Sequence, residues 1–387
     1  MANRYSVFYL LSRTTVCGGC LAFLLKKVNF YAAYPKPIWR IFTMKMDALV
    51  KRHAERGLWL EQAEVPALKE GEALVKIHKT AICGTDVHIY DWNQWAQDTI
   101  KTPMIIGHEF VGEIVEIKGQ SPVFKVGDLV SGEGHIVCGH CRNCMEGHRH
   151  FCPNTKGIGV NRDGIFAEYA AIPLTNLWKC EKNIPEELYA IFDPLGNATH
   201  TALAFPVLGE DVLITGAGPI GVMAAAICKH AGARHVVITN RSDWRLDFAK
   251  QVVPGVVTVN TKTTNLKDVQ RELGMTEGFG VGLEMSGNAN ALNQMIDNMI
   301  NGGKIALLGL GIEGGIAWDK FIFKGLAVQG IYGRKMFDTW RQMSTMLQSG
   351  LDISKIITHR LPYTEFEKGF ELMESKKSGK IILEWSK

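Results

Sequence analysis

The chain has 387 residues, of which 46% are apolar and 21% are charged, and its formal net charge is +4. This length allows two domains with cores of their own, and the composition is that of a globular protein and not of a disordered one. Residues 1–45 contain seven Lys or Arg and no acid, so the remainder of the chain is slightly acidic. A slightly acidic body gives no electrostatic reason to bind nucleic acid or an anionic membrane.

Residues 1–45 differ from the rest. Their longest apolar run, Val16–Leu25, is well short of the roughly 18 to 20 residues that span a bilayer. An acid-free segment with Arg is typical of a transit peptide, and the apolar run resembles a weak signal peptide. Cys17 and Cys20 have redox spacing, but no strand and helix surround them. Because Met44 and Met46 precede the first globular segment, we favour an upstream start codon and place residues 1–45 outside the fold.

From Asp47 the sequence predicts short strands separated by Gly-containing turns, which indicates a folded-over β domain. The loop at Cys83 and the turn at His108 each follow one of these segments, so their side chains can converge. The expected strands are Asp47–Lys51, Leu58–Ala63, Ala73–Ala81, Gly112–Ile117 and Leu129–Gly132.

This part of the chain contains two sets of metal-ligand residues. Cys83, His108 and Glu109 supply a thiolate, an imidazole and a carboxylate, which leave one position of a zinc ion open for chemistry. Glu109 has a second interpretation, as a carboxylate that orients the site without binding the metal. Four closely spaced cysteines can instead close a tetrahedral shell, which predicts a structural zinc and a reducing compartment. These four are Cys138, Cys141, Cys144 and Cys152, whereas the isolated Cys180 and Cys228 are expected in the core.

After Pro185 the pattern changes to that of a nucleotide-binding fold. Asp211–Thr215 is an apolar strand, Gly216-Ala-Gly218-Pro-Ile-Gly221 opens a helix over Val222–Ala231, and a second strand follows at His235–Thr239. The glycines permit a tight turn and let backbone N–H groups approach a pyrophosphate at the helix N-terminus. A glycine motif in this context predicts dinucleotide binding.

Alternating strands and helices continue for about 120 residues and predict a doubly wound parallel sheet with its ligand at the carboxyl ends of the strands. The tail from Trp340 contains one helical stretch and two β-like runs, Ile357–Arg360 and Lys380–Trp385, which we assign to the first domain. The remaining expected elements are strands at Val256–Asn260, Gly280–Met285, Lys304–Gly309 and Leu326–Ile331 and a helix at Ala289–Ile300.

A dinucleotide fold beside an open zinc site predicts alcohol oxidation with hydride transfer to a nicotinamide. The substrate proton needs a path to solvent, and Thr85 and His88 lie two and five residues after Cys83. A hydroxyl and an imidazole at these positions can relay it. The alternative is that His88 is a packed or surface residue.

These motifs resemble the zinc-dependent medium-chain dehydrogenase/reductase family over Met46–Lys387. The resemblance implies a GroES-like β-rich catalytic domain with a zinc lobe, formed by residues 46–192 and 333–387, and a Rossmann domain formed by residues 193–332. The motifs that carry it are Thr80-Ala-Ile-Cys-Gly-Thr-Asp-Val-His-Ile-Tyr90, Gly132-Glu-Gly-His-Ile-Val-Cys-Gly-His-Cys-Arg-Asn-Cys144, Ala190-Ile-Phe-Asp-Pro-Leu-Gly-Asn197 and Gly330-Ile-Tyr-Gly-Arg-Lys-Met-Phe-Asp-Thr-Trp340.

The resemblance also implies roles for individual residues. Cys83, His108 and Glu109 would hold the catalytic zinc, and Thr85 with His88 would form the proton relay. Asp193 matches a family carboxylate that tunes the zinc-bound water or, in some relatives, occupies the place of a third protein ligand. The residues that match cofactor contacts are Gly216, Gly218, Ile220, Gly221, Asn240, Arg245, Leu307, Leu308, Gly309, Ile331 and Tyr332.

Among family members, the long motifs resemble those of enzymes that act on L-threonine. The implied reaction is oxidation of L-threonine at its hydroxyl carbon to L-2-amino-3-oxobutanoate with reduction of NAD⁺, in a cytoplasmic homotetramer with two zinc ions per subunit. One departure concerns the cofactor: where the family usually has Asp, this chain has Asn240 followed by Arg241, which does not repel the 2′-phosphate of NADP⁺. NAD⁺ is the favoured cofactor, and NADP⁺ is the alternative.

Two other functions stay open at this point. A zinc-dependent dehydrogenase of polyols or secondary alcohols would use the same residues, because no partner for the threonine ammonium and carboxylate can be located in the sequence. A non-catalytic zinc and nucleotide-binding protein would leave Cys83, Thr85, His88, His108 and Glu109 without a purpose.

Overall fold

The structure is a computed structural model that describes residues 44–385. The interpretations of residues 1–43 as an upstream-start extension, a targeting segment or a redox motif lie outside this range. Strand β1 (Lys45–Lys51) begins at Lys45, one residue before the predicted start of the fold. No helix within residues 44–385 is both long enough and apolar enough to cross a membrane.

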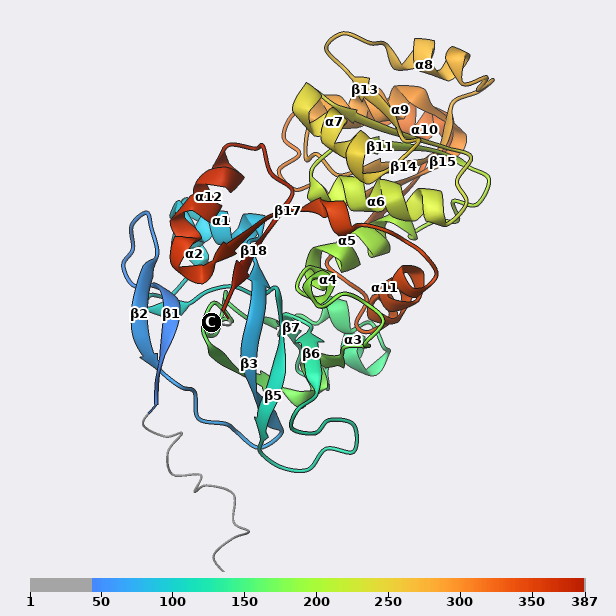
Figure 1. The fold of residues 1–387 in the computed structure, drawn as a ribbon. Helices are drawn as coiled ribbons and strands as arrows, with labels where there is room; N and C mark the ends of the chain where they lie inside the picture. The colour runs from blue at the N-terminus through green and yellow to red at the C-terminus, as the bar shows by residue number, and fades with distance from the viewer. Residues whose placement is uncertain (1–43, 386–387) are drawn as a thin grey trace, which may run out of the picture. The chain divides into compact units, whose positions relative to one another are not determined.

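The first part of the chain folds around a seven-stranded sheet (Figure 1). The strand order is β10-β6-β5-β3-β18-β17, and β9 also pairs with β3. Five of these strands, β3, β5, β6, β17 and β18, were predicted near their observed bounds, whereas β9 and β10 were not predicted. The strands are β3 (Glu72–Ala81), β5 (Phe110–Ile117), β6 (Leu129–Gly132), β9 (Tyr169–Pro173), β10 (Leu177–Lys179), β17 (Ile357–Pro362) and β18 (Lys380–Glu384).

Two smaller sheets and several helices complete this part. β1 pairs with β2 and β4, and β7 pairs with β8, all antiparallel. The apolar side chains of these elements form one buried core with the large sheet and with α1, α2 and α12. The elements are β2 (Trp59–Glu64), β4 (Met104–Ile105), β7 (His135–Ile136), β8 (Lys156–Gly157), α1 (Gly84–Tyr90), α2 (Gln94–Thr99), α3 (Arg142–Met145), α4 (Glu186–Tyr189) and α12 (Phe366–Glu374).

The second part contains a parallel sheet of order β13-β12-β11-β14-β15-β16. The order reverses between β11 and β14, so a crevice for a ligand is expected outside the carboxyl ends of these strands. This sheet confirms the predicted doubly wound fold. Its strands are β11 (Asp211–Thr215), β12 (His235–Asn240), β13 (Val257–Asn260), β14 (Phe279–Glu284), β15 (Met299–Leu307) and β16 (Ala327–Gly330).

Both faces of this sheet are covered because successive side chains of a strand point to opposite faces. Val212 and Ile214 of β11 pack with α6 and α7, whereas Leu213 packs with α8, α9 and α10. Burial on both faces explains the continuous apolar runs of the strands. The covering helices are α6 (Pro219–His230), α7 (Asp243–Val252), α8 (Leu266–Glu272), α9 (Ala289–Asn298) and α10 (Trp318–Lys324) (Figure 1).

The C-terminal tail returns to the first sheet. β18 pairs antiparallel with β3 and parallel with β17. The tail contains two α-helices where the sequence predicted one: α12 packs near β18, and α11 (Asp338–Gln348) packs on α5 (Phe192–Ala202). The prediction of a single helix was wrong because Gly350–Ser354 and the strand β17 separate two amphipathic stretches.

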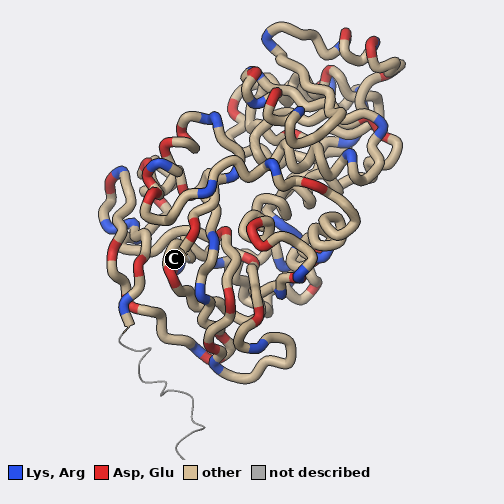
Figure 2. Tube along the Cα trace, viewed as in Figure 1, with Lys and Arg blue, Asp and Glu red and all other residues tan. Residues whose placement is uncertain are grey.

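Charged residues of both signs are interspersed along the described chain (Figure 2). This interspersion agrees with the slightly acidic composition of the chain after residue 45.

Candidate active site and metal centres

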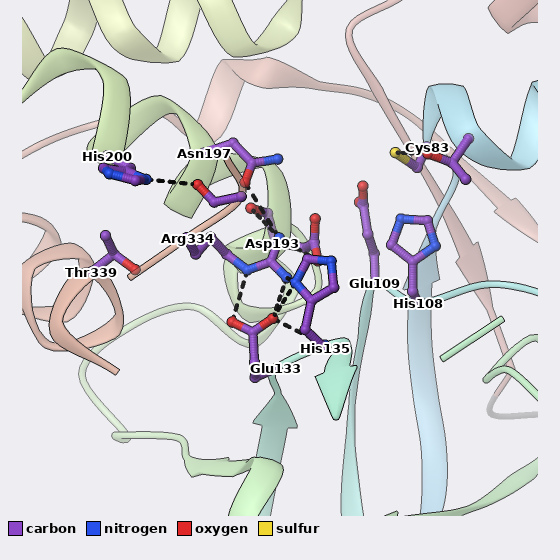
Figure 3. Close-up of polar contacts among 12 residues, drawn as sticks. Cys83, His108, Glu109, Glu133, His135, Asp193, Asn197, His200, Arg334 and Thr339 are labelled. Atoms are coloured by element: carbon purple, nitrogen blue, oxygen red, sulfur yellow. Dashed lines mark hydrogen bonds and ion pairs between the residues drawn. The ribbon is translucent and has the colours of Figure 1, made fainter. Parts of the chain in front are cut away.

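Two neighbouring segments bring the first predicted metal-ligand set together. Cys83 precedes the first turn of α1, and His108 and Glu109 precede β5. The backbone N–H of Ala81 donates to the carbonyl of Glu109 at 3.0 Å and so continues the β3–β5 ladder toward the site. One ligand atom from each of Cys83, His108 and Glu109 consequently lies within 4.8 Å of the others (Figure 3).

Asp86 supports this set from the first turn of α1. Its buried carboxylate accepts a hydrogen bond from the backbone N–H of Cys83 at 2.8 Å, and Oδ1 lies 3.6 Å from Nδ1 of His108. Burial raises the pKa of Asp86. Burial alone would lower the pKa of His108, but Asp86 and the Cys83 sulfur raise it well above its usual value. Asp86 Oδ1 and His108 Nδ1 have no hydrogen-bond partner among residues 44–385. These buried polar groups beside a thiol suit a zinc ion.

Glu109 is bound by a lysine from the far end of the chain. Lys380, the first residue of β18, places Nζ 2.8 Å from Oε1 and 2.7 Å from Oε2 of Glu109, and also donates to the carbonyl of Ile82 at 2.7 Å. Both side chains are buried. Burial outweighs the attraction of Lys380 and raises the pKa of Glu109 to about 7. Any bond from Glu109 to a metal therefore competes with this ion pair.

Asp193 belongs to a second buried network (Figure 3). It lies in the first turn of α5, where Nη1 of Arg334 approaches Oδ1 at 2.8 Å. The same guanidinium binds Glu133 through Nε at 2.9 Å and through Nη2, and Trp340 Nε1 donates to Glu133 at 3.1 Å. Burial opposes ionisation of Glu133, but Arg334 and His135 hold its pKa well below the usual range. This network fixes the direction of the Asp193 carboxylate.

The two networks meet at one pocket. A cavity of about 170 Å³ is lined by Cys83, Thr85 and His108 from one side and by Asp193 and Arg334 from the other. Sequence positions more than 200 residues apart thus share one small polar cavity. A small polar substrate with a hydroxyl group can reach the metal-ligand set here.

The four clustered cysteines also converge. Their sulfur atoms lie within 4.8 Å of one another, and all four are free thiols. Backbone N–H groups of His140 and Cys141 lower the pKa of Cys138 to about 6, whereas burial and neighbouring sulfurs raise that of Cys144 to about 12. Four thiolates this close repel one another unless a cation lies between them, so the set fits a structural zinc.

The glycine turn between β11 and α6 leaves room for a ligand. Gly218 is the residue before α6, Pro219 is the first residue of the helix, and a Cβ atom on Gly218 would meet nothing within 4 Å. A Cβ atom on Gly221 would instead lie 2.0 Å from the carbonyl oxygen of Gly216, which has φ of +99°. The turn therefore requires glycine for its own geometry and keeps its outer face open for a pyrophosphate.

Most of the chain matches known proteins. A model of the alcohol dehydrogenase GroES-like domain matches residues 69–183, and a model of zinc-binding dehydrogenases matches residues 219–349. The chain is 58% identical to L-threonine 3-dehydrogenases of Shewanella frigidimarina (strain NCIMB 400) and Proteus mirabilis (strain HI4320), covering 88% of this chain and 100% of each relative. The chain belongs to the zinc-dependent medium-chain dehydrogenase family. The solved alcohol dehydrogenase of Thermotoga maritima superposes with a TM-score of 0.79 at 26% identity, covering 88% and 99% of the two chains.

Within this dehydrogenase, the two relay candidates lie at different depths on α1. Thr85 lines the pocket, and its Oγ1 is 3.9 Å from the Cys83 sulfur. His88 is exposed one turn further along, with Nδ1 2.9 Å from Asn93 Nδ2. No hydrogen bond joins Thr85 to His88 in the described chain. Thr85 is therefore the inner residue of the pair and His88 the outer one. A proton relay through both residues would need a bound ligand or water between them.

The residues predicted to contact the cofactor of the dehydrogenase surround the carboxyl ends of the parallel strands. Asn240 and Gly216 line a cleft of about 670 Å³ at these ends. Arg245 on α7 is the exception, since it does not line this cleft and its Nη1 donates to the carbonyl of Ser378 at 3.0 Å. The remaining predicted contacts lie at the start of α6 (Ile220), at the end of β15 and just after it (Leu307, Leu308 and Gly309) and after β16 (Ile331 and Tyr332).

Sequence reasoning gave no role to four residues that build the site: Asp86, Glu133, Arg334 and Lys380. Asp86, Glu133 and Arg334 lie inside the motifs that carry the family resemblance, so their ionisable side chains could have identified them as candidate site residues. Lys380 had no local signal, since a lysine at the start of a β-like run resembles a solvent-exposed residue.

Proposed function

We propose that this chain oxidises L-threonine at its hydroxyl carbon, yields L-2-amino-3-oxobutanoate and transfers the hydride to NAD⁺. The observation that carries the proposal is the 58% identity to L-threonine 3-dehydrogenases over their full length. The polar pocket beside the metal-ligand set supports it, because its size and charged lining suit a small polar alcohol.

Each residue of the pocket has a proposed part in this reaction. Cys83, His108 and Glu109 hold the catalytic zinc, and the bond from Glu109 competes with its ion pair to Lys380. Zinc bound there supplies the Lewis acidity that favours the alkoxide form of the substrate hydroxyl. Thr85 accepts the substrate proton while it passes its own hydroxyl proton on, through a bound ligand or water, to His88, which releases a proton to solvent.

Asp193 has a proposed part on the other side of the pocket. It pairs with the Arg334 guanidinium and lines the cavity opposite the metal-ligand set. Its negative charge there can hold a substrate ammonium or a water molecule in place. The four cysteines hold the structural zinc.

We also propose the domain division expected from sequence, with residues 46–192 and 333–387 as the catalytic domain and 193–332 as the nucleotide-binding domain. The pairing of β18 with β3 supports the return of the tail to the catalytic domain. A reducing cytoplasmic location suits the free thiols of the metal sites.

A homotetramer is proposed as the assembly. Its support lies at the edge of the parallel sheet, where β16 pairs with one strand among residues 44–385 and nearby apolar side chains are exposed. Ile322 and Phe323 of α10 are 74% and 85% exposed. An open strand edge beside such side chains is a surface that copies of a chain can cover.

The test is the initial rate of NADH formation by purified protein of native metal content. L-threonine should give the highest kcat/KM, and sorbitol and 2,3-butanediol should give much lower values. A preference for either of the latter would favour the alternative function as a polyol or secondary-alcohol dehydrogenase. Metal analysis should find two zinc ions per chain, one for each ligand set.

A further inference from the structure

We propose that the cleft beyond β12 and β13 binds a 2′-phosphate on the adenosine ribose, so that the enzyme uses NADP⁺ as well as NAD⁺. The inference rests on the proposed dehydrogenase function for its catalytic consequence only. It concerns the charges and hydrogen-bonding groups where the adenosine end of a dinucleotide would lie.

The position of the cleft follows from strand register. β12 and β13 are parallel, and their last residues, Asn240 and Asn260, are paired. The residues that follow, Arg241 and Lys262, therefore emerge at the same edge of the sheet, and both line the cleft of about 670 Å³. Gly216 of the glycine turn lines it too, which connects this end to the pyrophosphate position.

The side chain of Asn240 is oriented by its own backbone. Its Oδ1 accepts hydrogen bonds from the backbone N–H groups of Arg241 at 2.8 Å and Ser242 at 3.0 Å. The amide nitrogen remains free to donate. A carboxylate at this position would accept hydrogen bonds from the ribose hydroxyls and repel a phosphate. The amide instead offers a donor, which serves a hydroxyl oxygen and a phosphate oxygen alike.

The surrounding charges favour an anion. Arg241 and Lys262 are exposed, and neither forms an ion pair with any residue in the range 44–385. The acid that lines the cleft, Asp297, is paired with Lys320. Asp243, the acid nearest in sequence to Arg241, accepts a hydrogen bond from Asn260 Nδ2 at 2.6 Å. The cleft thus has two cationic side chains, Arg241 and Lys262, without an ion-pair partner among residues 44–385. It also has a neutral residue, Asn240, at the position where an NAD⁺-selective site has an acid.

A direct binding measurement tests the proposed 2′-phosphate site independently of catalysis. Isothermal titration of the full-length protein with adenosine 2′,5′-bisphosphate and with adenosine 5′-monophosphate isolates the effect of the 2′-phosphate. We expect the bisphosphate to bind at least about tenfold more tightly at low salt, as two nearby cations can provide, with a smaller ratio at high salt. Equal affinities, or tighter binding of the monophosphate, would overturn the inference.

Variants test which residues cause the preference for the bisphosphate. Arg241→Ala/Lys262→Ala should abolish the preference for the bisphosphate, and Asn240→Asp should reverse it while NAD⁺ binding persists. The control Lys250→Ala/Arg271→Ala removes the same charge from exposed positions that do not line the cleft, and should leave the preference unchanged. An Arg241→Ala/Lys262→Ala protein with the wild-type preference would refute the assignment of these residues.

Steady-state kinetics gives the catalytic consequence. With L-threonine, the wild-type kcat/KM for NADP⁺ should lie within about tenfold of that for NAD⁺, and Asn240→Asp should widen the gap toward NAD⁺. Inactivity toward threonine with both cofactors, together with tighter bisphosphate binding, would reject the proposed substrate and leave the phosphate site supported.

Discussion

Replacing Arg334 by Met should strongly destabilise the protein. The guanidinium is 2% exposed, and it pairs with Glu133, which is 1% exposed, and with Asp193. Removing it leaves two carboxylates buried without their cation, and breaking a buried pair in this way costs about 3–5 kcal/mol. At roughly 2 °C per kcal/mol for a chain of this size, the Tm should fall by about 6–10 °C.

The assay is a double-mutant cycle read by thermal unfolding, with Glu133→Leu as the second change. The double variant removes both charges, so its loss of stability should be smaller than the sum of the two single losses by about 2 kcal/mol or more. Arg360→Met is the matched control, because Arg360 also binds a carboxylate, Glu187, through two nitrogens but is 43% exposed. Its Tm should change by at most about 2 °C.

Strictly additive losses for Arg334 and Glu133 would refute this reasoning, as would a Tm change for Arg334→Met no larger than that of the control. Either result would mean that the carboxylates near the pocket do not depend on the guanidinium.

Three further predictions concern the relay, the metals and pH. Thr85→Val should lower kcat by about 10²-fold or more without changing the metal content, because it removes a proton-transfer group and no metal ligand. A kcat near that of the wild type in steady-state assays would show that Thr85 is not part of the relay. Cys144→Ser should reduce the zinc content from two ions per chain to one and lower the Tm. Elemental analysis and thermal unfolding measure these two changes. Retention of both ions would contradict a four-cysteine site. Burial lowers the pKa of His200 below its usual 6.5. The unfolded chain then binds a proton that the folded chain does not, so stability is lost as the pH falls below 6.5. His200→Gln should give a shallower decline of Tm with acid, and an unchanged slope would show that His200 titrates normally in the folded protein.

Much of this protein was determined by its sequence alone. The thiolate, imidazole and carboxylate of Cys83, His108 and Glu109 have few uses other than metal binding, and the four clustered cysteines predict a closed metal site from spacing alone. The turn Gly216–Gly221 is equally local, because the strand before it and the helix after it lie within a few residues. Such signals depend on residue type and short-range geometry, which the order of residues contains directly.

Only the tertiary structure decided which charges support those groups. Lys380 reaches Glu109 from 271 residues away, and Arg334 reaches Glu133 from 201 residues away. The small strands β9 and β10 likewise depend on distant partners, because they pair with β3 and β6. A buried ion pair is stable only when both members are removed from water together at close distance, and that condition is met by the packing of remote segments and not by the pattern of either one.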